Sequence, residues 1–318
     1  MNEIIYFFLA LTASIIGIYF FDKKSREKNF ALGIDINKKA QNKTPEATGI
    51  ILLIVLCVFV LGITFLEEFN LKIFYWIGLV SVFSLVGFFD DTKTKWTGKT
   101  LGWKERALPI TVASLLFGYL VSGEIISGIL IGFFVAVFSS FHNSFAGLNG
   151  WEVGSSYIIA LFSAFLLIQT EFFGYSIIVL GAILGLLVFN LFPARVFPGD
   201  SGTLLMGSSI TGLIALTMKT ELFFLLSLFY LPHLIDFLFL KMLTNRKDIT
   251  QVKTRPYRIL EDERIAIPDY KGKTRYDFAK LIIRIFGPLK EKNIVLIIWL
   301  VVLLNCLFWL TVLGKFSL

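Results

Sequence analysis

Long runs of apolar residues alternate with short polar connectors along most of this chain of 318 residues. A helix needs roughly 20 apolar residues to cross a bilayer core about 30 Å thick. Ten runs approach that length, near residues 3–21, 49–66, 73–89, 107–122, 125–141, 154–170, 175–191, 202–218, 221–240 and 293–313. The pattern predicts an all-α integral membrane protein with about ten transmembrane helices and one long connector, residues 241–292.

Composition supports a membrane protein, because hydrophobic residues make up 56% of the chain and charged residues only 17%. No internal repeat or separate soluble domain is visible, so we expect a single transmembrane domain over residues 1–318. Cys57 and Cys306 both fall inside apolar runs. They therefore predict neither a disulfide framework nor a thiolate metal site.

Basic residues predict the orientation in the membrane. Of the 30 Lys and Arg residues, 27 lie in the connectors that follow the odd-numbered runs. Such connectors stay in the cytoplasm, so both termini are expected outside. The first run lacks the basic start and the small-residue cleavage site of a signal peptide. The net charge of +7 borders the membrane and carries no nucleic-acid recognition motif, which favours membrane lipid and phosphorylated substrates as partners over nucleic acid.

Two adjacent carboxylates, Asp90 and Asp91, follow the third apolar run. Neighbouring carboxylates repel each other unless a metal ion or nearby cations stabilise the charged form. Five cations follow in the same connector: Lys93, Lys95, Lys99, Lys104 and Arg106. The pair predicts a site for phosphates with a divalent ion, and the alternative is a solvated helix end.

Other odd connectors carry groups that phosphoryl transfer requires, namely oxygen ligands for Mg²⁺ and backbone amides that can approach phosphate. Asn143 and Asp200 offer oxygen ligands, and both also fit the simpler role of a helix cap. Four glycines permit tight turns and close approach: Gly147, Gly150, Gly199 and Gly202. We expect these connectors to converge into one site at the cytoplasmic face.

Five segments resemble the polyprenyl-phosphate N-acetylhexosamine-1-phosphate transferases: GIDINK with TPEATG, FFDD, NSFAGLNGWEVG, VFPGDSG and FGPLKEKN. AGLNGWEVG is most similar to the eukaryotic and archaeal branch, the UDP-N-acetylglucosamine:dolichyl-phosphate N-acetylglucosamine-1-phosphotransferases. The resemblance implies ten transmembrane helices and a cytoplasmic catalytic pocket. It also implies transfer of a sugar 1-phosphate, most simply N-acetylglucosamine 1-phosphate, from a UDP-sugar to a polyprenyl phosphate of the dolichyl type. That transfer releases UMP and begins lipid-linked glycan assembly, as in protein glycosylation.

The resemblance also implies roles for individual residues. Asn143 and Asp200 would bind Mg²⁺, with Mn²⁺ as an alternative, and Asp90 and Asp91 would lie beside the lipid phosphate. Uracil would be framed by the loop from Gly147 to Gly150, with Asn149, and by the ring of Phe197, with the Asp35-Ile36 backbone and Glu46 close by. A catalytic cation is expected after the aspartate pair, where Lys104 and Arg106 both qualify and Lys104 is preferred.

The last connector departs from the eukaryotic pattern Pro-Arg-His-Arg, because this chain has Arg255-Pro256-Tyr257-Arg258 and no His in 241–292. Sugar contacts carry over to Arg258, with Arg255 as a second candidate. Another UDP-sugar, or undecaprenyl phosphate as acceptor, therefore remains an alternative. A homodimer is also left open.

The chemistry expected is direct attack of an acceptor phosphate oxygen on the sugar-linked phosphorus, with Asp90 orienting or deprotonating the acceptor. A two-step route through an aspartyl phosphate is the alternative. Outside this class, a transporter would place charged groups near the midplane, often in repeated halves, whereas the polar residues here lie at one surface. His233 and Asp236 share a helix face in the ninth run, and both a functional and a structural role are open.

Overall fold

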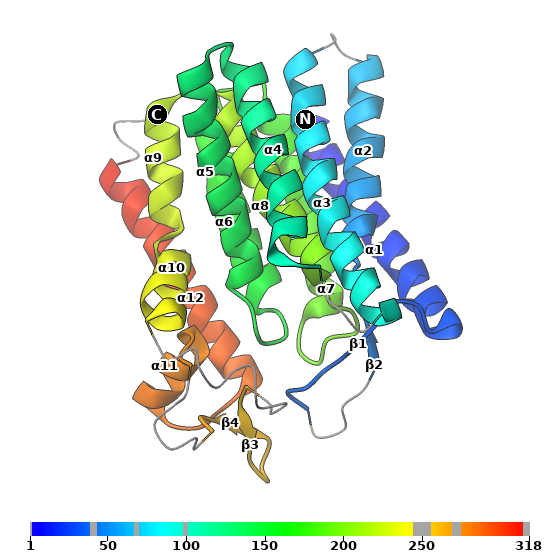
Figure 1. Cartoon of the computed structure of the whole chain (residues 1–318), viewed down its shortest axis with the longest axis vertical. Coiled ribbons are helices and arrows are strands. Elements are labelled where there is room, and N and C mark those ends of the chain that lie inside the picture. The colour runs from blue at the N-terminus through cyan, green and yellow to red at the C-terminus, as the bar shows by residue number, and fades with distance from the viewer. Residues whose placement is uncertain are drawn as a thin grey trace.

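A computed structural model describes residues 2–38, 43–66, 70–97, 101–243, 256–268 and 275–313. It is a helical bundle, which confirms the predicted all-α membrane class (Figure 1). The helices are α1 (Asn2–Lys28), α2 (Gly49–Leu66), α3 (Leu71–Thr97), α4 (Trp103–Ser122), α5 (Ile125–Ser144), α6 (Trp151–Leu167), α7 (Phe173–Asn190), α8 (Gly199–Leu216), α9 (Thr220–Phe229), α10 (Leu231–Leu234), the π-helix η1 (Ile235–Met242), α11 (Phe278–Phe286) and α12 (Glu291–Leu313).

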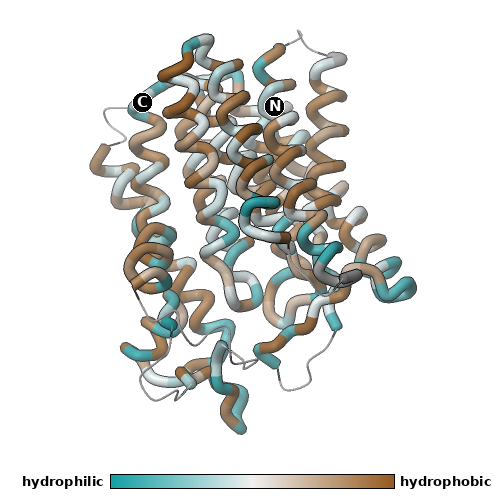
Figure 2. Tube along the Cα trace, viewed as in Figure 1, coloured by the Kyte–Doolittle hydropathy of each residue, from teal (hydrophilic) through white to brown (hydrophobic). Residues whose placement is uncertain are grey.

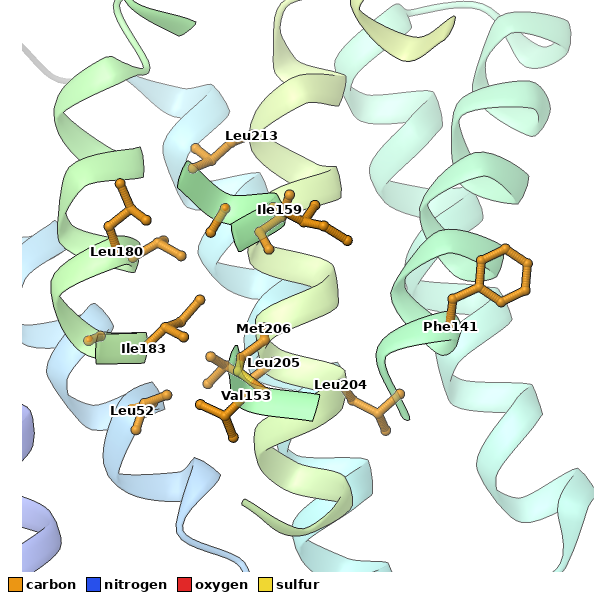
Figure 3. Close-up of a cluster of buried hydrophobic side chains, with 14 of the residues drawn as sticks. Leu52, Phe141, Val153, Ile159, Leu180, Ile183, Leu204, Leu205, Met206 and Leu213 are labelled. Atoms are coloured by element: carbon orange, nitrogen blue, oxygen red, sulfur yellow. The ribbon is translucent and has the colours of Figure 1, made fainter. Parts of the chain in front are cut away.

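Helix α8 forms the centre of the bundle, and every residue from Ser201 to Leu216 is buried. Side chains of α2, α6, α7 and α8, including Leu52, Val153, Ile183 and Leu205, line the interior around it (Figure 3). The outer helices instead expose apolar side chains, such as Ile126 on α5 at 76% exposure. Exposing so many apolar side chains to water is energetically unfavourable, so this outer surface faces lipid.

Each of the ten predicted runs coincides with a helix or with the bent segment that joins α9 to η1. Within the described residues, five helices are long and apolar enough to cross a membrane: α1, α3, α5, α7 and α12. The segment formed by α9, α10 and η1 adds a sixth span if it is counted as one helix. Its two parts are bent by 57° relative to each other. The bend follows from Pro232, which cannot donate a helical hydrogen bond. The protein is therefore multi-pass, and the count of ten spans stays a prediction.

Short strands lie at one end of the bundle, together with α11 and the connector that leads into α6 (Figure 1). Strand β1 (Leu32–Ile34) pairs antiparallel with β2 (Lys43–Pro45). Strands β3 (Arg258–Ile259), β4 (Arg264–Ala266) and β5 (Leu289–Lys290) form an antiparallel sheet in that order. Hydrophilic residues gather at this end, as Figure 2 shows. The odd-numbered connectors therefore converge as predicted, whereas the compartment they face and the single-domain organisation stay predictions.

Candidate active site

Asp90 and Asp91 lie near the end of α3 and are both buried, with exposed fractions of 5% and 8%. The Asp91 carboxylate accepts hydrogen bonds from the backbone amides of Asp200 (2.9 Å) and Ser201 (3.1 Å). These are orphan amides at the start of α8, so Asp91 caps that helix from a neighbouring one. The capping role that the sequence left open for Asp200 thus belongs to Asp91.

Arg106, in the first turns of α4, joins the two other carboxylates. Its Nη1 donates to Asp90 Oδ2 at 2.7 Å and also to Asp200 Oδ2. Asp90 Oδ1 accepts in addition from the backbone amide of Leu101 (2.5 Å). One guanidinium nitrogen therefore lies between two acidic side chains, a position where positive charge is stabilised from both sides.

The preferred catalytic cation, Lys104, lies away from these carboxylates. Its side chain is exposed, and its ammonium stands 5.6 Å from the centre of the Trp103 ring. Lys93 pairs with the exposed Glu105 at 3.2 Å. The structure therefore favours Arg106 beside Asp90, and a catalytic role for Lys104 stays a prediction. The side chain of Lys95, and all of Lys99, lie outside the described residues.

Asn143, near the end of α5, completes the group that we call the carboxylate cluster (Asp90, Arg106, Asn143 and Asp200). Burial raises the pKa of Asp200 to about 6. The Arg106 guanidinium opposes this shift, the Asp90 carboxylate adds to it, and a hydrogen bond from the Asn143 side chain lowers it. Four helix ends thus meet at one strongly interacting set of charges.

The carboxylate cluster fits a divalent cation by its donor chemistry. Two carboxylate oxygens approach one positively charged nitrogen, and an amide side chain lies beside them. Carboxylate and amide oxygens are the ligands that Mg²⁺ prefers, usually together with substrate phosphates. Among the described residues no group of three His, Cys, Asp or Glu side chains could hold a metal ion. A metal at Asn143 and Asp200 would therefore need phosphate oxygens to complete its ligand set.

Two glycines allow the close approach that builds this cluster. A Cβ added at Gly87 on α3 would lie 2.3 Å from the backbone carbonyl carbon of Asp200. Gly199 adopts a φ of +67°, and a Cβ there would lie 2.3 Å from Asp91 Oδ2. Any side chain at either position would push α8 away from α3 and separate the charged groups.

Gly147, Asn149 and Gly150 belong to the connector between α5 and α6, and residues 147–150 are called the 147–150 loop below. Gly147 and Gly150 have φ angles of 156° and 84°, which favour glycine. The Gly147 carbonyl accepts from Asn37 Nδ2 (2.8 Å) and the Gly150 carbonyl accepts from Trp299 Nε1 (3.0 Å). Remote parts of the chain therefore fix the backbone of this loop.

Asn149 is held most closely. Its backbone amide donates to Glu291 Oε1 at 2.8 Å, and its side-chain Nδ2 donates to Asp35 Oδ2 at 3.0 Å. Lys38 forms an ion pair with Glu291 and lies 3.8 Å from Asp35 Oδ2. We name Asp35, Lys38 and Glu291 the holding cluster. The sequence predicted only the backbone of Asp35 near this site and missed the three side-chain roles, although each residue belongs to a segment that carries the family resemblance.

Glu46 and Phe197 lie together beside β1. A Cβ added at Gly33 would be 2.7 Å from Glu46 Oε2 and 3.4 Å from the Phe197 ring. The backbone amide of Phe197 donates to the Pro45 carbonyl (2.7 Å), which joins the first connector to the start of α8. Ile36 is 44% exposed. The structure thus brings together the segments predicted to frame a base.

The last connector covers the 147–150 loop. A Cβ at Gly147 would lie 3.2 Å from the Tyr257 hydroxyl, which donates to Asp277 Oδ2 at 3.0 Å. Burial raises the pKa of Tyr257, so the hydroxyl stays protonated as a donor. Arg258 is exposed on β3, while Arg255 lies outside the described residues. The predicted sugar contacts of both arginines stay predictions.

A pocket of about 640 Å³ opens behind the 147–150 loop, between the first connector, the connector after α7 and the sheet β3–β5. One side of the pocket is lined by Asp35, Lys38 and Glu291. Its apolar lining includes Phe192 and Ile265. The holding cluster therefore separates this pocket from Asn149.

His233 and Asp236 have different partners. Asp236 pairs with Lys241 (2.7 Å) and accepts from the backbone amide of Phe278 at the start of α11 (2.7 Å). The His233 ring instead stacks near Phe145, with 4.0 Å between ring centres. These contacts support the structural interpretation, because they anchor the last connector and pack the interior.

Comparison with known proteins places the chain among transferases. Residues 73–219 match the model of glycosyl transferase family 4, and the match spans the whole carboxylate cluster. A putative glycosyltransferase of Methanocaldococcus jannaschii is 27% identical over 308 residues, covering 95% of this chain and 93% of that protein.

Two further relatives carry more specific names. A putative UDP-N-acetylglucosamine–dolichyl-phosphate N-acetylglucosaminephosphotransferase of Sulfolobus acidocaldarius is 37% identical over 163 residues, covering 49% of this chain and 45% of that protein. A phospho-N-acetylmuramoyl-pentapeptide-transferase of Prochlorococcus marinus is 30% identical over 252 residues, covering 71% and 69%. The more specific archaeal name thus rests on about half of either chain.

Proposed function

The chain belongs to glycosyl transferase family 4, and we propose that it transfers N-acetylglucosamine 1-phosphate from UDP-N-acetylglucosamine to a dolichyl-type polyprenyl phosphate, releasing UMP. Membership makes it a membrane-embedded transferase and removes the transporter alternative. The archaeal relative is named as a transferase of N-acetylglucosamine phosphate to dolichyl phosphate, and the bacterial relative as a transferase of a phospho-N-acetylmuramoyl pentapeptide. The identity of the sugar and of the lipid is the finer part of the proposal.

One observation carries the proposal: Asp90, Arg106, Asn143 and Asp200 reach a single cluster from four helix ends. Phosphoryl transfer depends mainly on positioning and on neutralising phosphate charge, and this cluster supplies acids and a fixed cation for both. The cluster also lies where polar connectors meet the ends of four apolar helices. A lipid phosphate and a soluble nucleotide can therefore reach it from adjacent phases.

In the proposed reaction an oxygen of the polyprenyl phosphate attacks the sugar-linked phosphorus. The new P–O bond forms as the bond to the UMP oxygen breaks, and the electron pair leaves with UMP. Asp90 orients the acceptor phosphate or removes its proton, which is easily lost because the second phosphate pKa is about 6. Arg106 stabilises the phosphate charge beside Asp90. Both Asp91 oxygens cap α8, so Asp91 holds the site together rather than acting on substrate.

Asn143 and Asp200 would hold Mg²⁺ or Mn²⁺, which when bound neutralises negative charge on the nucleotide diphosphate. The 147–150 loop, Phe197 and the exposed Ile36 would enclose the uracil, with Glu46 close by. Arg258 would contact the sugar phosphate from β3. We assign the site to the cytoplasmic face because the connectors around it hold most of the basic residues.

The test uses purified full-length protein with polyprenyl phosphate and a panel of UDP-sugars, following UMP release with Mg²⁺, with Mn²⁺ and with EDTA. We expect release with UDP-N-acetylglucosamine, loss with EDTA and recovery on adding either metal. Asp90→Asn and Asp200→Asn should each lower release by about 10³-fold, the effect expected when a group that stabilises transition-state charge is removed.

Asp262→Asn is the matched control, because Asp262 is exposed and pairs with Arg264 at 2.6 Å. It should release UMP at the wild-type rate. Wild-type release from folded Asp200→Asn would remove Asp200 from the site. Absence of UMP release from the wild type with every UDP-sugar would refute the proposed function.

A further inference from the structure

Asn149 receives an unusual amount of support for a residue in a connector. It is 7% exposed, and two buried carboxylates hold it, Asp35 at 8% exposure and Glu291 at 3%. Glu291 fixes the backbone amide and Asp35 fixes the side-chain amide. Two acids from opposite ends of the chain thus orient one neutral residue.

Lys38 makes this arrangement electrostatically stable. Two carboxylates buried side by side would repel each other, and burial alone would favour their neutral forms. The Lys38 ammonium pairs with Glu291, lies 3.8 Å from Asp35 and stands 4.0 Å above the Phe192 ring. The Lys38 cation therefore lies beside both acids that hold Asn149.

The hydrogen bond to Asp35 shows how the Asn149 amide is turned, because Nδ2 donates to Asp35 Oδ2 at 3.0 Å. An ionised carboxylate only accepts hydrogen bonds, whereas a side-chain amide has one accepting end and one donating end. The NH₂ group of Asn149 must therefore face Asp35. Its carbonyl oxygen, Oδ1, is consequently held on the other side of the amide. If the amide rotated by 180°, Oδ1 would face the Asp35 carboxylate, and neither group could donate a hydrogen bond.

We propose that the holding cluster (Asp35, Lys38 and Glu291) fixes the Asn149 amide so that the site accepts uracil and rejects cytosine. The inference rests on the proposed function, in which the 147–150 loop binds the base of the nucleotide sugar. Uracil carries a proton on N3, which an amide oxygen accepts, whereas N3 of cytosine is itself an acceptor. If the Asn149 amide cannot turn, its Oδ1 faces N3 of a bound cytosine. Both atoms are acceptors, so no hydrogen bond forms between them.

The first test varies the ligand and leaves the protein unchanged. Binding of UDP, CDP and N3-methyl-UDP to the wild-type protein with Mg²⁺ is measured by calorimetry in detergent. One matched base pairing typically discriminates by about 1–3 kcal/mol, so UDP should bind about 5- to 150-fold more tightly than CDP. N3-methyl-UDP lacks the proton and should lose a similar factor. Binding of N3-methyl-UDP within twofold of UDP would overturn the proposal.

The second test uses Asp35→Asn to remove the carboxylate that fixes the orientation of the Asn149 amide. Asparagine can both donate and accept, so the Asn149 amide becomes free to turn either way. We expect the UDP-to-CDP affinity ratio to fall about tenfold, with a higher KM for the UDP-sugar and kcat within about twofold of wild type. Asp262→Asn serves again as the control and should keep the wild-type ratio.

The ratio of UDP affinity to CDP affinity distinguishes a loss of amide orientation from a general disruption of the site, because a general disruption weakens the binding of both nucleotides equally. An unchanged ratio in folded Asp35→Asn would overturn the proposal. Should Asp35→Asn fail to fold, the three ligands on the wild-type protein decide. If the wild type releases UMP but binds UDP no better than CDP, the proposed role of the holding cluster is wrong and the proposed function stands. If the wild type releases no UMP at all, the proposed function itself is refuted.

Discussion

The carboxylate cluster and the 147–150 loop lie at the same end of the bundle, yet their polar groups are satisfied in different ways. In the cluster, acids share one cation, and Arg106 bridges Asp90 to Asp200. In the loop, neutral groups receive hydrogen bonds from separate elements, such as Asn37 and Trp299. The first arrangement concentrates charge, and the second fixes shape.

This difference predicts a division of labour. Closely spaced charges interact strongly with phosphate and with a divalent cation, so changes in the cluster should affect the chemical step. A loop whose backbone is held by remote partners is pre-organised, so changes there should affect affinity. Substitutions that alter kcat and KM separately can therefore confirm or break the comparison.

Arg106→Met should have the largest effect, because it leaves Asp90 and Asp200 facing each other without their shared cation. We expect UMP release to fall by about 10³-fold with UDP affinity changed less than about threefold. Lys104→Met should lower release less than about threefold, since its exposed ammonium is screened by water. If Lys104 is the catalytic cation, the order of the two variants will reverse.

Gly87→Ala should act on the cluster and spare the loop. Its Cβ would meet the Asp200 backbone at 2.3 Å, and overpacking of this kind costs about 1–3 kcal/mol of stability. Thermal denaturation in detergent should show the loss, and kcat should fall while KM for the UDP-sugar stays unchanged. Gly78→Ala on the same helix has no atom within 4 Å of the added Cβ and should change neither. A raised KM in Gly87→Ala would mean that the two regions are coupled.

Lys38→Met should have a smaller effect than Arg106→Met, and this effect should fall on affinity. Removing the ammonium leaves the carboxylates of Asp35 and Glu291 without their shared cation, so their hold on Asn149 weakens. We expect KM for the UDP-sugar to rise about tenfold, the size of one charge-assisted hydrogen bond, with kcat within about twofold of wild type. Lys43→Met, exposed on β2, is the matched control. A fall in kcat without a change in KM would contradict the division of labour.

The helices could be predicted from the sequence because an apolar run is a local property, and each of the ten runs coincides with helix. The short strands and α11 were missed. Strands of two or three residues carry no alternation long enough to be read, and their pairing depends on distant partners. The 57° bend within the ninth run did have a signal, because Pro232 lies near its middle.

The candidate site could be predicted as a set of residues but not as a set of contacts. Convergence of Asp90, Asn143 and Asp200 is confirmed, since their connectors meet at one end of the bundle. The pairing of Lys38 with Glu291 joins positions 253 residues apart, which no local pattern reveals. The choice of Arg106 over Lys104 depends on the direction each side chain takes from the first turn of α4.

The cap that Asp91 places on α8 sets an order for biogenesis. Asp91 and the amide of Asp200 are 109 residues apart in sequence, so α3 leaves the ribosome well before α8 has been made. A nascent chain that ends before α8 cannot form this contact, and it therefore lacks the surface on which nucleotide and lipid would meet. Insertion of α8 among the helices that precede it is thus the event that completes the carboxylate cluster.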